Sequence, residues 1–280
     1  MIKKVLITLI LVVGILGAGA YYGYQLLLKP RQELAKERTQ AALAPVPTPT
    51  PDPAVPALEA AIAIQKTGDL VAAREAISLL ITQFPDSPAL PEAQRLLGEV
   101  NMDALLSTYP LPNKLEYTVV KGDALAKIAG KTKADAELIM RSNNLGSINL
   151  SIGQRLLIPQ MAPSIHIHRA DKTLTLYDGA DFVKQYPLLS ASVPGAPGQK
   201  ITGRVTDKTA TFENKRVAFG SKEYAASDRM IILGQGMTIR GVAESADGQP
   251  KAAAFGIALP APEMEELFLF ISRGTPVTID

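Results

Sequence analysis

Residues 117–129 read YTVVKGDALAKIA and residues 153–159 read GQRLLIP, and these two stretches decide the fold of the middle of the chain. Between them, Asp135 is a residue type that caps helices, and it precedes a segment, 136–143, whose apolar side chains can face a core. The Gly-Gln pair that opens the second stretch supplies a turn into a closing apolar strand. The sequence therefore predicts a small α+β unit whose last helix is followed by a strand.

Residues 113–160, which contain both stretches, closely resemble a LysM domain. The resemblance implies the order strand, helix, helix, strand (βααβ), with the two strands paired and both helices on one face. One position departs from the family pattern. Ala124 stands where the family usually has a hydroxyl residue that caps the first helix, and a lost cap typically costs about 1 kcal/mol.

In LysM domains the sugar lies in a shallow groove between the loop after the first strand and the loop before the last. By resemblance, these loops are 122–125 and 149–152. Such a groove offers backbone amides and carbonyls to N-acetyl and hydroxyl groups, with apolar contact from leucine and isoleucine side chains. For Leu125 and Ile152 the alternative is an ordinary core position. The glycan-binding residues that the resemblance implies are Gly122, Asp123, Ala124, Leu125, Asn149, Leu150, Ser151 and Ile152.

Downstream, residues 161–280 predict a mostly antiparallel β domain with one helix, built as a sandwich or a barrel-like sheet. Short strands are expected around 165–167, 174–176, 182–188, 216–219, 230–233, 237–239 and 276–279, with a helix at 262–272.

The end of this domain resembles the catalytic domain of peptidoglycan L,D-transpeptidases. That family carries Ile-His-Gly, then Ser-x-Gly-Cys-Ile-Arg-Leu, then a helix and Gly-Thr-Pro-Val. Here the corresponding segments read TIRG at 238–241, AAFGIAL at 253–259 and GTPV at 274–277. Arg240 thus stands at the histidine position and Gly256 at the cysteine position.

This resemblance implies a domain that lacks the cysteine nucleophile and the histidine base of the family. The 280 residues contain no cysteine, whereas acyl transfer of this kind requires a thiolate beside a base. Arg240 is always protonated and is a poor base, so Arg240, Gly241 and Gly256 are degenerate former catalytic positions, and no catalytic residue is assigned. Arg240 has two alternative roles: it binds a carboxylate in the former cleft, or it pairs with Glu244 or Asp247.

An active enzyme with a non-cysteine mechanism remains the alternative. Ser245 is the serine to consider as a nucleophile, but the sequence places no histidine or lysine to activate it. His166 and His168 point to one face of a strand, yet a third metal ligand is not evident. We therefore expect no metal and no cofactor.

The N-terminal residues 1–28 predict a transmembrane helix, because Lys3 and Lys4 precede an apolar run, 5–28, that is long enough to span a bilayer. A cleaved signal peptide is the alternative, since residues 18–20 read AGA, the small-x-small form of a cleavage site. In both cases the rest of the chain is expected outside the cytoplasm.

Two segments connect this N-terminus to the LysM-like unit. Residues 29–56 end in PVPTPTPDPAVP, which predicts an extended linker of about 3 Å per residue. Residues 57–112 predict three helices that resemble about one and a half tetratricopeptide (TPR) repeats. They form either a structural spacer or a groove for a protein partner, and solenoids usually need at least about three repeats.

Together these features predict a multidomain α+β protein of the bacterial cell envelope. It would be anchored in the cytoplasmic (inner) membrane with its C-terminal domains in the periplasm, or secreted after signal cleavage. It would bind peptidoglycan glycan strands and carry an inactive transpeptidase-like domain. A net charge of +2 argues against nucleic acid as a partner. A scaffold that recruits cell-wall enzymes through its helices is a further alternative.

Overall fold

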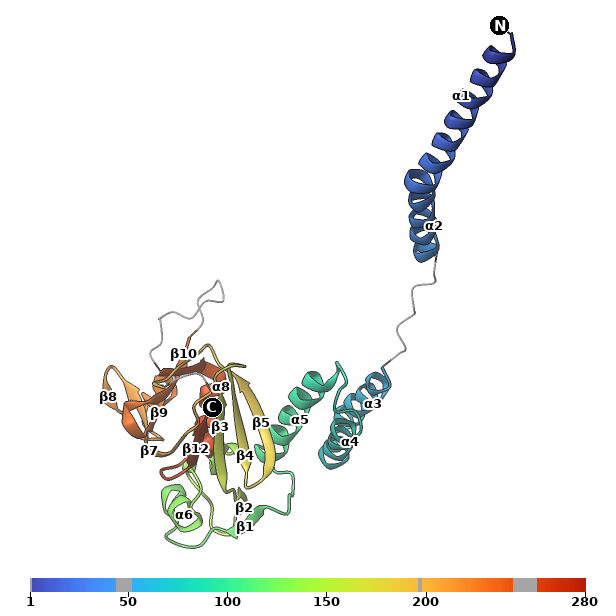
Figure 1. Ribbon diagram of the computed structural model, residues 1–280. Helices are drawn as coiled ribbons and strands as arrows, with labels where there is room; N and C mark the ends of the chain where they lie inside the picture. Colours follow the sequence, from blue (N-terminus) through green and yellow to red (C-terminus); the bar gives the residue numbers. More distant parts are fainter. Residues whose placement is uncertain (1, 44–51, 196–197, 244–255) are drawn as a thin grey trace. The chain divides into compact units, whose positions relative to one another are not determined.

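The computed structural model describes residues 2–43, 52–195, 198–243 and 256–280 (Figure 1). The chain divides into two compact units, Met1–Pro51 and Asp52–Asp280. Each unit is described by itself.

The first unit is helical. It contains α1 (Ile2–Gly23), a short π-helix η1 (Tyr24–Leu28) and α2 (Lys29–Leu43). Among the residues that the structure describes, no helix combines the length and apolarity needed to cross a membrane. The transmembrane helix expected at 1–28 is therefore wrong. Within the apolar run, α-helical geometry ends at Gly23, and the leucines that follow belong to η1.

The second unit begins with three helices: α3 (Ala54–Lys66), α4 (Leu70–Gln83) and α5 (Leu90–Leu105). The side chain of Asp69 caps α4 by accepting a hydrogen bond from the amide of Ala72, at 3.0 Å. Their apolar faces share a core of Leu58, Ala61, Ala73, Ile77, Leu80, Ala93, Leu96, Leu97 and Val100. Three helices lie where the sequence predicts three.

Helix α5 belongs to two cores. Leu96 and Val100 pack in the helical core, whereas Met102 and Leu105 pack in the core of the C-terminal sheet. The helix approaches the sheet closely at Gly98, where an added Cβ would lie 3.0 Å from Cγ of Lys184. A side chain at this position would require Lys184 to shift by a few tenths of an ångström.

The LysM-like unit follows as β1 (Lys114–Thr118), α6 (Leu125–Thr132), α7 (Ala136–Ser142) and β2 (Arg155–Pro159). Strands β1 and β2 pair antiparallel. Asp135 caps α7 by accepting a hydrogen bond from the amide of Glu137, at 2.8 Å. A separate core of Val119, Leu125, Ile128, Ile139, Leu156 and Ile158 holds the unit together.

Lys114 fixes the LysM-like unit to the end of α5. Its Nζ atom donates hydrogen bonds to the carbonyls of Ala104 (2.6 Å), Ser107 (2.5 Å) and Tyr109 (3.0 Å). These bonds satisfy carbonyl groups at and beyond the last turn of the helix. Burial lowers the pKa of the Lys114 ammonium group to about 8.

The C-terminal part is a curled, ten-stranded mixed sheet in the order β5-β4-β3-β12-β7-β9-β10-β11-β6, with β8 paired to β7 (Figure 1). Its strands are β3 (Pro163–His168), β4 (Thr173–Asp178), β5 (Asp181–Pro187), β6 (Ser190–Ser192), β7 (Ile201–Phe212), β8 (Lys215–Arg216), β9 (Asp228–Leu233), β10 (Thr238–Val242), β11 (Gly256–Pro260) and β12 (Pro276–Ile279), and α8 (Ala261–Phe270) packs on the core. Most pairs are antiparallel, but β10–β11 and β3–β12 are parallel.

The LysM-like unit is docked on this sheet through α7. Glu137 accepts hydrogen bonds from Arg141 of its own helix (2.7 Å) and from the buried hydroxyl of Tyr224 (2.7 Å). Lys208 pairs with Asp135 at 2.6 Å, and the guanidinium of Arg229 lies 3.9 Å from the centre of the Tyr224 ring. Burial, together with Glu137, raises the pKa of Tyr224. The hydrogen bond of Tyr224 and the ion pair of Lys208 fix the LysM-like segment on the C-terminal sheet.

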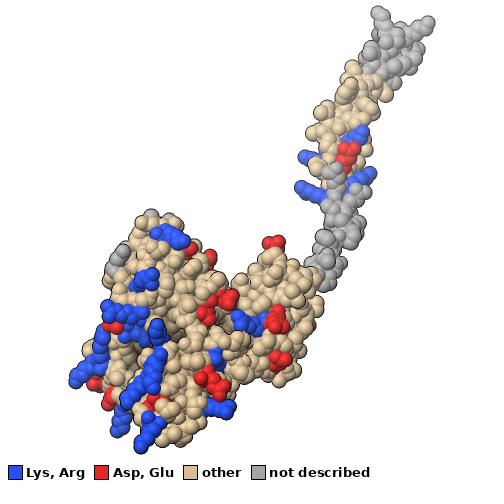
Figure 2. Space-filling view, turned by 90° about the horizontal axis from the view of Figure 1, so that it is seen from below, with Lys and Arg blue, Asp and Glu red and all other residues tan. Residues whose placement is uncertain are grey.

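Charge is distributed unevenly over the second unit. Residues 52–113 carry eight Asp and Glu against three Lys and Arg, whereas residues 114–160 carry four against seven. Within the second unit, Figure 2 shows many basic side chains gathered on one side, with acidic side chains on the helical segment and beside it. The helical segment is therefore the acidic part of this unit.

Candidate functional site

Backbone hydrogen bonds bring together the two loops that the sequence selects. Val119 follows β1, and its amide donates to the carbonyl of Gln154 at 2.9 Å, while its carbonyl accepts from the amide of Gly153 at 2.8 Å. The loop that starts after Val119 and the loop that ends before Gly153 therefore emerge side by side. Gly122 and Gly153 have φ angles of 89° and 84°, a region that favours glycine.

Apolar side chains are exposed around these loops. Ile152 is 72% exposed, Val120 is 52% exposed and Ile148 is 49% exposed, whereas Leu125 is 4% exposed. Leu150 is partly buried against the local core. Leu125 is thus a core residue, and Ile152 lies on the surface. The loops present a small apolar surface edged by backbone groups, which suits a shallow binding groove.

Asp123 organises the first loop. Its carboxylate accepts hydrogen bonds from the amide of Val120 (3.1 Å), the hydroxyl of Tyr117 (2.8 Å) and the ammonium group of Lys131 (2.8 Å). These three donors, with Lys131 contributing most, lower the pKa of Asp123 to about 2. The carboxylate does not cap α6, whose N-cap residue, Ala124, makes no side-chain hydrogen bond.

The second loop is held by its own short-range bonds. The amide of Ser151 donates to Oε1 of Gln154 at 3.1 Å, and the amide of Asn149 donates to Oγ of Ser147 at 3.2 Å. Asn149 and Ser151 themselves are exposed. Their side chains are accessible to a ligand.

Sequence reasoning missed four residues of this surface. Tyr117 and Lys131 were not selected, although they fix Asp123, and Val120 and Ile148 were not selected, although both are exposed and apolar. For Val120 and Ile148 the sequence contains a signal of exposure, because each is an apolar residue next to the polar or glycine-containing residues of a loop. For Lys131 there is none, since its partner lies eight residues away.

The second candidate site comprises the positions on β10 and β11 that the sequence resemblance places at the histidine and cysteine of L,D-transpeptidases. Arg240 is paired with Ala258 in the parallel ladder. Gly241 faces α8, where an added Cβ would lie 3.1 Å from Cβ of Met264. Gly256 has a φ angle of 93°, and an added Cβ would lie 3.0 Å from the carbonyl oxygen of Thr238. A side chain at position 256 would therefore be strained and crowded.

Arg240 leaves a buried polar atom at this site. Within the described residues, Nε of Arg240 and Oε2 of Glu263 are buried without a hydrogen-bond partner. Glu244, Ser245 and Asp247, considered above as partners or as a nucleophile, lie outside the described residues. Both alternatives for Arg240 remain predictions.

The histidines of β3 have partners within the fold. The His166 ring lies 5.0 Å from the Tyr177 ring, and Nδ1 of His168 lies 2.9 Å from Oδ1 of Asp280. In the part of the chain that the structure describes, no group of three or more His, Asp or Glu is arranged to hold a metal ion.

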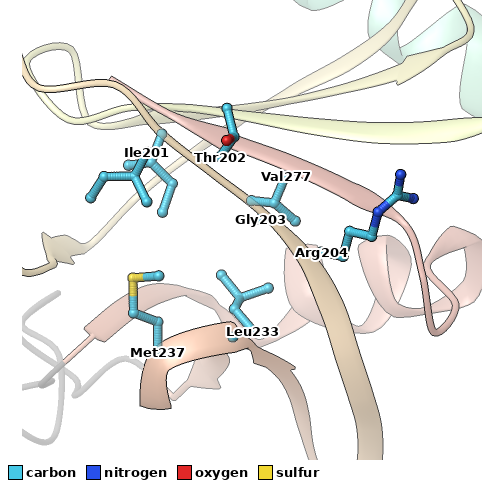
Figure 3. Close-up of a pocket in the computed structure, with 9 residues that line it drawn as sticks. Ile201, Thr202, Gly203, Arg204, Leu233, Met237 and Val277 are labelled. Atoms are coloured by element: carbon cyan, nitrogen blue, oxygen red, sulfur yellow. The ribbon is translucent and has the colours of Figure 1, made fainter.

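A small pocket lies between the sheet and the β9–β10 turn (Figure 3). The side chains of Ile201, Leu233 and Met237 face it. Its volume of about 30 Å³ has room for one or two waters. Ligand sites are typically about 300–1,000 Å³, so this pocket is too small for a substrate.

Comparison with known proteins identifies one family within the chain. Residues 117–159 match the LysM domain family, which confirms the LysM prediction for that segment. No curated protein sequence matches the chain significantly.

Solved structures show similarity to L,D-transpeptidases. An L,D-transpeptidase from Mycobacterium smegmatis is 13% identical with a TM-score of 0.31, over 46% of this chain and 64% of that protein. L,D-transpeptidase 1 from Mycobacterium tuberculosis is 11% identical (TM-score 0.28, 45% and 77%). The catalytic domain of the E. faecium enzyme is 14% identical (TM-score 0.29, 43% and 98%). The match spans less than two thirds of the M. smegmatis protein, and scores this low establish no shared activity.

Proposed function

We propose that this chain is a cell-envelope protein that binds peptidoglycan glycan strands through residues 117–159. The observation that carries the proposal is the family match of this segment. LysM domains bind peptidoglycan glycan. The paired loops and their exposed apolar residues supply a surface that fits such a ligand.

The contacts follow from the chemistry of the two loops. Ile152 and Val120 contact the apolar faces of the sugar rings, while backbone groups of 122–124 and 149–152 form hydrogen bonds with N-acetyl and hydroxyl groups. The exposed amide and hydroxyl of Asn149 and Ser151 add hydrogen bonds. Asp123 holds the first loop in shape rather than contacting the sugar, because its carboxylate already accepts three hydrogen bonds.

Sedimentation with isolated peptidoglycan sacculi tests this proposal. Ile152→Asp is expected to weaken binding about tenfold, which corresponds to about 1.4 kcal/mol, because it places a charge on the apolar surface. Leu115→Asp is the matched control: Leu115 is also exposed (43%), but it lies at the start of β1. The proposal fails if the full chain does not sediment with sacculi, or if both variants lose binding equally.

We also propose that the C-terminal sheet carries no transpeptidase activity and serves as a binding or regulatory module. The absence of cysteine from the sequence supports this, as does the crowding around Gly256. Incubation of the purified protein with tetrapeptide muropeptides tests it, and we expect no release of D-alanine. Cross-linked products detected by mass spectrometry would show an active enzyme instead.

A further inference from the structure

A groove of about 730 Å³ lies between α4 and the β4–β5 hairpin. One wall is the face of α4 that runs from Val71 to Thr82, and the opposite wall contains Asp181, Phe182 and Val183. We call it the helix–hairpin groove. It lies away from the loops of the LysM segment, so it does not depend on glycan binding.

The α4 wall is free to contact a partner. The core-facing residues of this helix are Ala73, Ile77 and Leu80, and none of them lines the groove. Val71 and Leu79 do line it, and they are 40% and 57% exposed. Large apolar side chains on one open wall indicate a surface that gains free energy when it is covered.

The groove is preformed. Nδ2 of Asn101 on α5 donates to the carbonyls of Phe182 (3.2 Å) and Val183 (2.8 Å), which holds the helix against the edge strand. Nδ2 of Asn113 donates to Oδ2 of Asp178 at 3.3 Å and fixes the end of the groove. A ligand therefore binds without first ordering these walls, which lowers the free-energy cost of binding.

Length and charge define the occupant. The wall from Val71 to Thr82 is about 16 Å long at 1.5 Å per helical residue, which matches about five residues of extended chain. Glu75, Asp178 and Asp181 line the groove against one cation, Arg74. The surrounding segment, residues 52–113, has the same acidic excess. A complementary ligand therefore carries positive charge between apolar side chains.

We propose that the helix–hairpin groove binds an extended segment of about five residues from another protein, in which lysine or arginine alternates with apolar residues. The apolar side chains contact Val71 and Leu79 on the α4 wall, and the basic side chains face Asp181 on the opposite wall, while Glu75 adds negative charge to the groove.

Fluorescence anisotropy with three labelled synthetic peptides, LKVKL, LSVSL and LEVEL, tests this proposal on the full chain. The basic peptide is expected to bind at least about tenfold more tightly than the neutral one, and the acidic peptide more weakly still. Affinity for the basic peptide should fall as salt rises. Equal affinity for the basic and neutral peptides, or no binding of the basic peptide, would overturn the proposal.

Matched variants locate the binding. Glu75→Lys and Leu79→Ser should each weaken the basic peptide about tenfold. Glu92→Lys makes the same charge change on α5 outside the groove lining and should change affinity little; circular dichroism verifies that the variants fold. Equal losses for Glu75→Lys and Glu92→Lys would indicate unspecific attraction and refute the proposal. A dimer in analytical ultracentrifugation that Leu79→Ser dissociates would assign the groove to a second copy, which also refutes it.

Discussion

Gly153, in a loop of the LysM segment, and Gly256, at the start of β11, both have a left-handed backbone, and the two glycines have opposite surroundings. At Gly153 (φ 84°) nothing lies within 4 Å of an added Cβ, whereas at Gly256 (φ 93°) the carbonyl oxygen of Thr238 would lie 3.0 Å away. Gly153 therefore has open space around it. Gly256 lies directly against the backbone of Thr238.

This difference separates what recognition requires from what catalysis requires. The paired loops need backbone groups and a few exposed apolar side chains, which many sequences supply. Acyl transfer needs a particular nucleophile and base in contact, and Gly256 and Arg240 supply neither. The proposed binding surface therefore depends less on particular side chains than the proposed loss of catalysis does.

The largest expected effect comes from the same change made in both regions. Gly153→Ala and Gly256→Ala should each destabilise the protein, by about 1–2 kcal/mol for a left-handed residue with a side chain. Only Gly153→Ala should also reduce sedimentation with sacculi, by about tenfold, because it alters the loop. Gly130→Ala is the control variant: Gly130 lies in α6 with open space around it, and this change should not reduce sedimentation. If Gly256→Ala reduces sedimentation as much, the two regions are not independent.

The next effect is the dependence of the first loop on pH. The pKa of Asp123 lies at about 2 in the folded protein against an ordinary 3.8, so its stabilising contribution is present above 3.8 and is lost as the pH falls to about 2. The hydrogen-exchange protection of residues 117–132, relative to the intrinsic exchange rate at each pH, should therefore fall over this range. Asp123→Asn should exchange fast at every pH. Glu116→Gln, which removes an exposed pair with Arg155, should behave as wild type, and identical profiles for the two variants would contradict the assignment.

An effect on stability without an effect on binding is expected where the LysM segment is docked on the sheet. Tyr224→Phe removes the buried hydrogen bond to Glu137 (2.7 Å) and should lower the free energy of unfolding by about 1–3 kcal/mol, because one carboxylate oxygen loses its donor. Thermal denaturation measures this change. Sedimentation with sacculi should not change, and a loss of binding would mean that the docking shapes the loops.

The smallest effect is expected from placing histidine at position 240 and cysteine at position 256, the residue types that L,D-transpeptidases carry there. The double variant Arg240→His with Gly256→Cys should release no D-alanine from muropeptides, because the strained backbone at position 256 does not present a thiolate to a base. The readout is mass spectrometry. Release above the level of wild type would show that only two side chains separate this domain from an enzyme.

The LysM segment was predictable because its signals are local. A turn, a cap and a closing strand fall within 43 residues, and a short-range bond from the amide of Ser151 to the side chain of Gln154 holds the second loop. Sequence did not distinguish buried Leu125 from exposed Ile152, since both are apolar residues in loops or at their ends. That distinction depends on which side chain points into the core of Ile128 and Ile139.

The C-terminal sheet was less predictable because its pairing is long-range. Strand β7 (Ile201–Phe212) reads ITGRVTDKTATF, which lacks a continuous apolar face, and no strand was expected there. Strand β8 (Lys215–Arg216) overlaps the strand expected at 216–219 only at Arg216. The parallel pairing of β12 with β3 joins segments more than 100 residues apart. At the N-terminus, hydropathy alone suggested one span where the helix geometry changes at Gly23.

Because α5 contributes side chains to two cores at once, it transmits mechanical load between them. Tension applied to the helices would pass through Leu96 and Val100 to Met102 and Leu105, and so to the edge of the sheet. Pulling from Asp52 should therefore not peel the helices off first at low force. The helices and the sheet should yield together, as a single mechanical element.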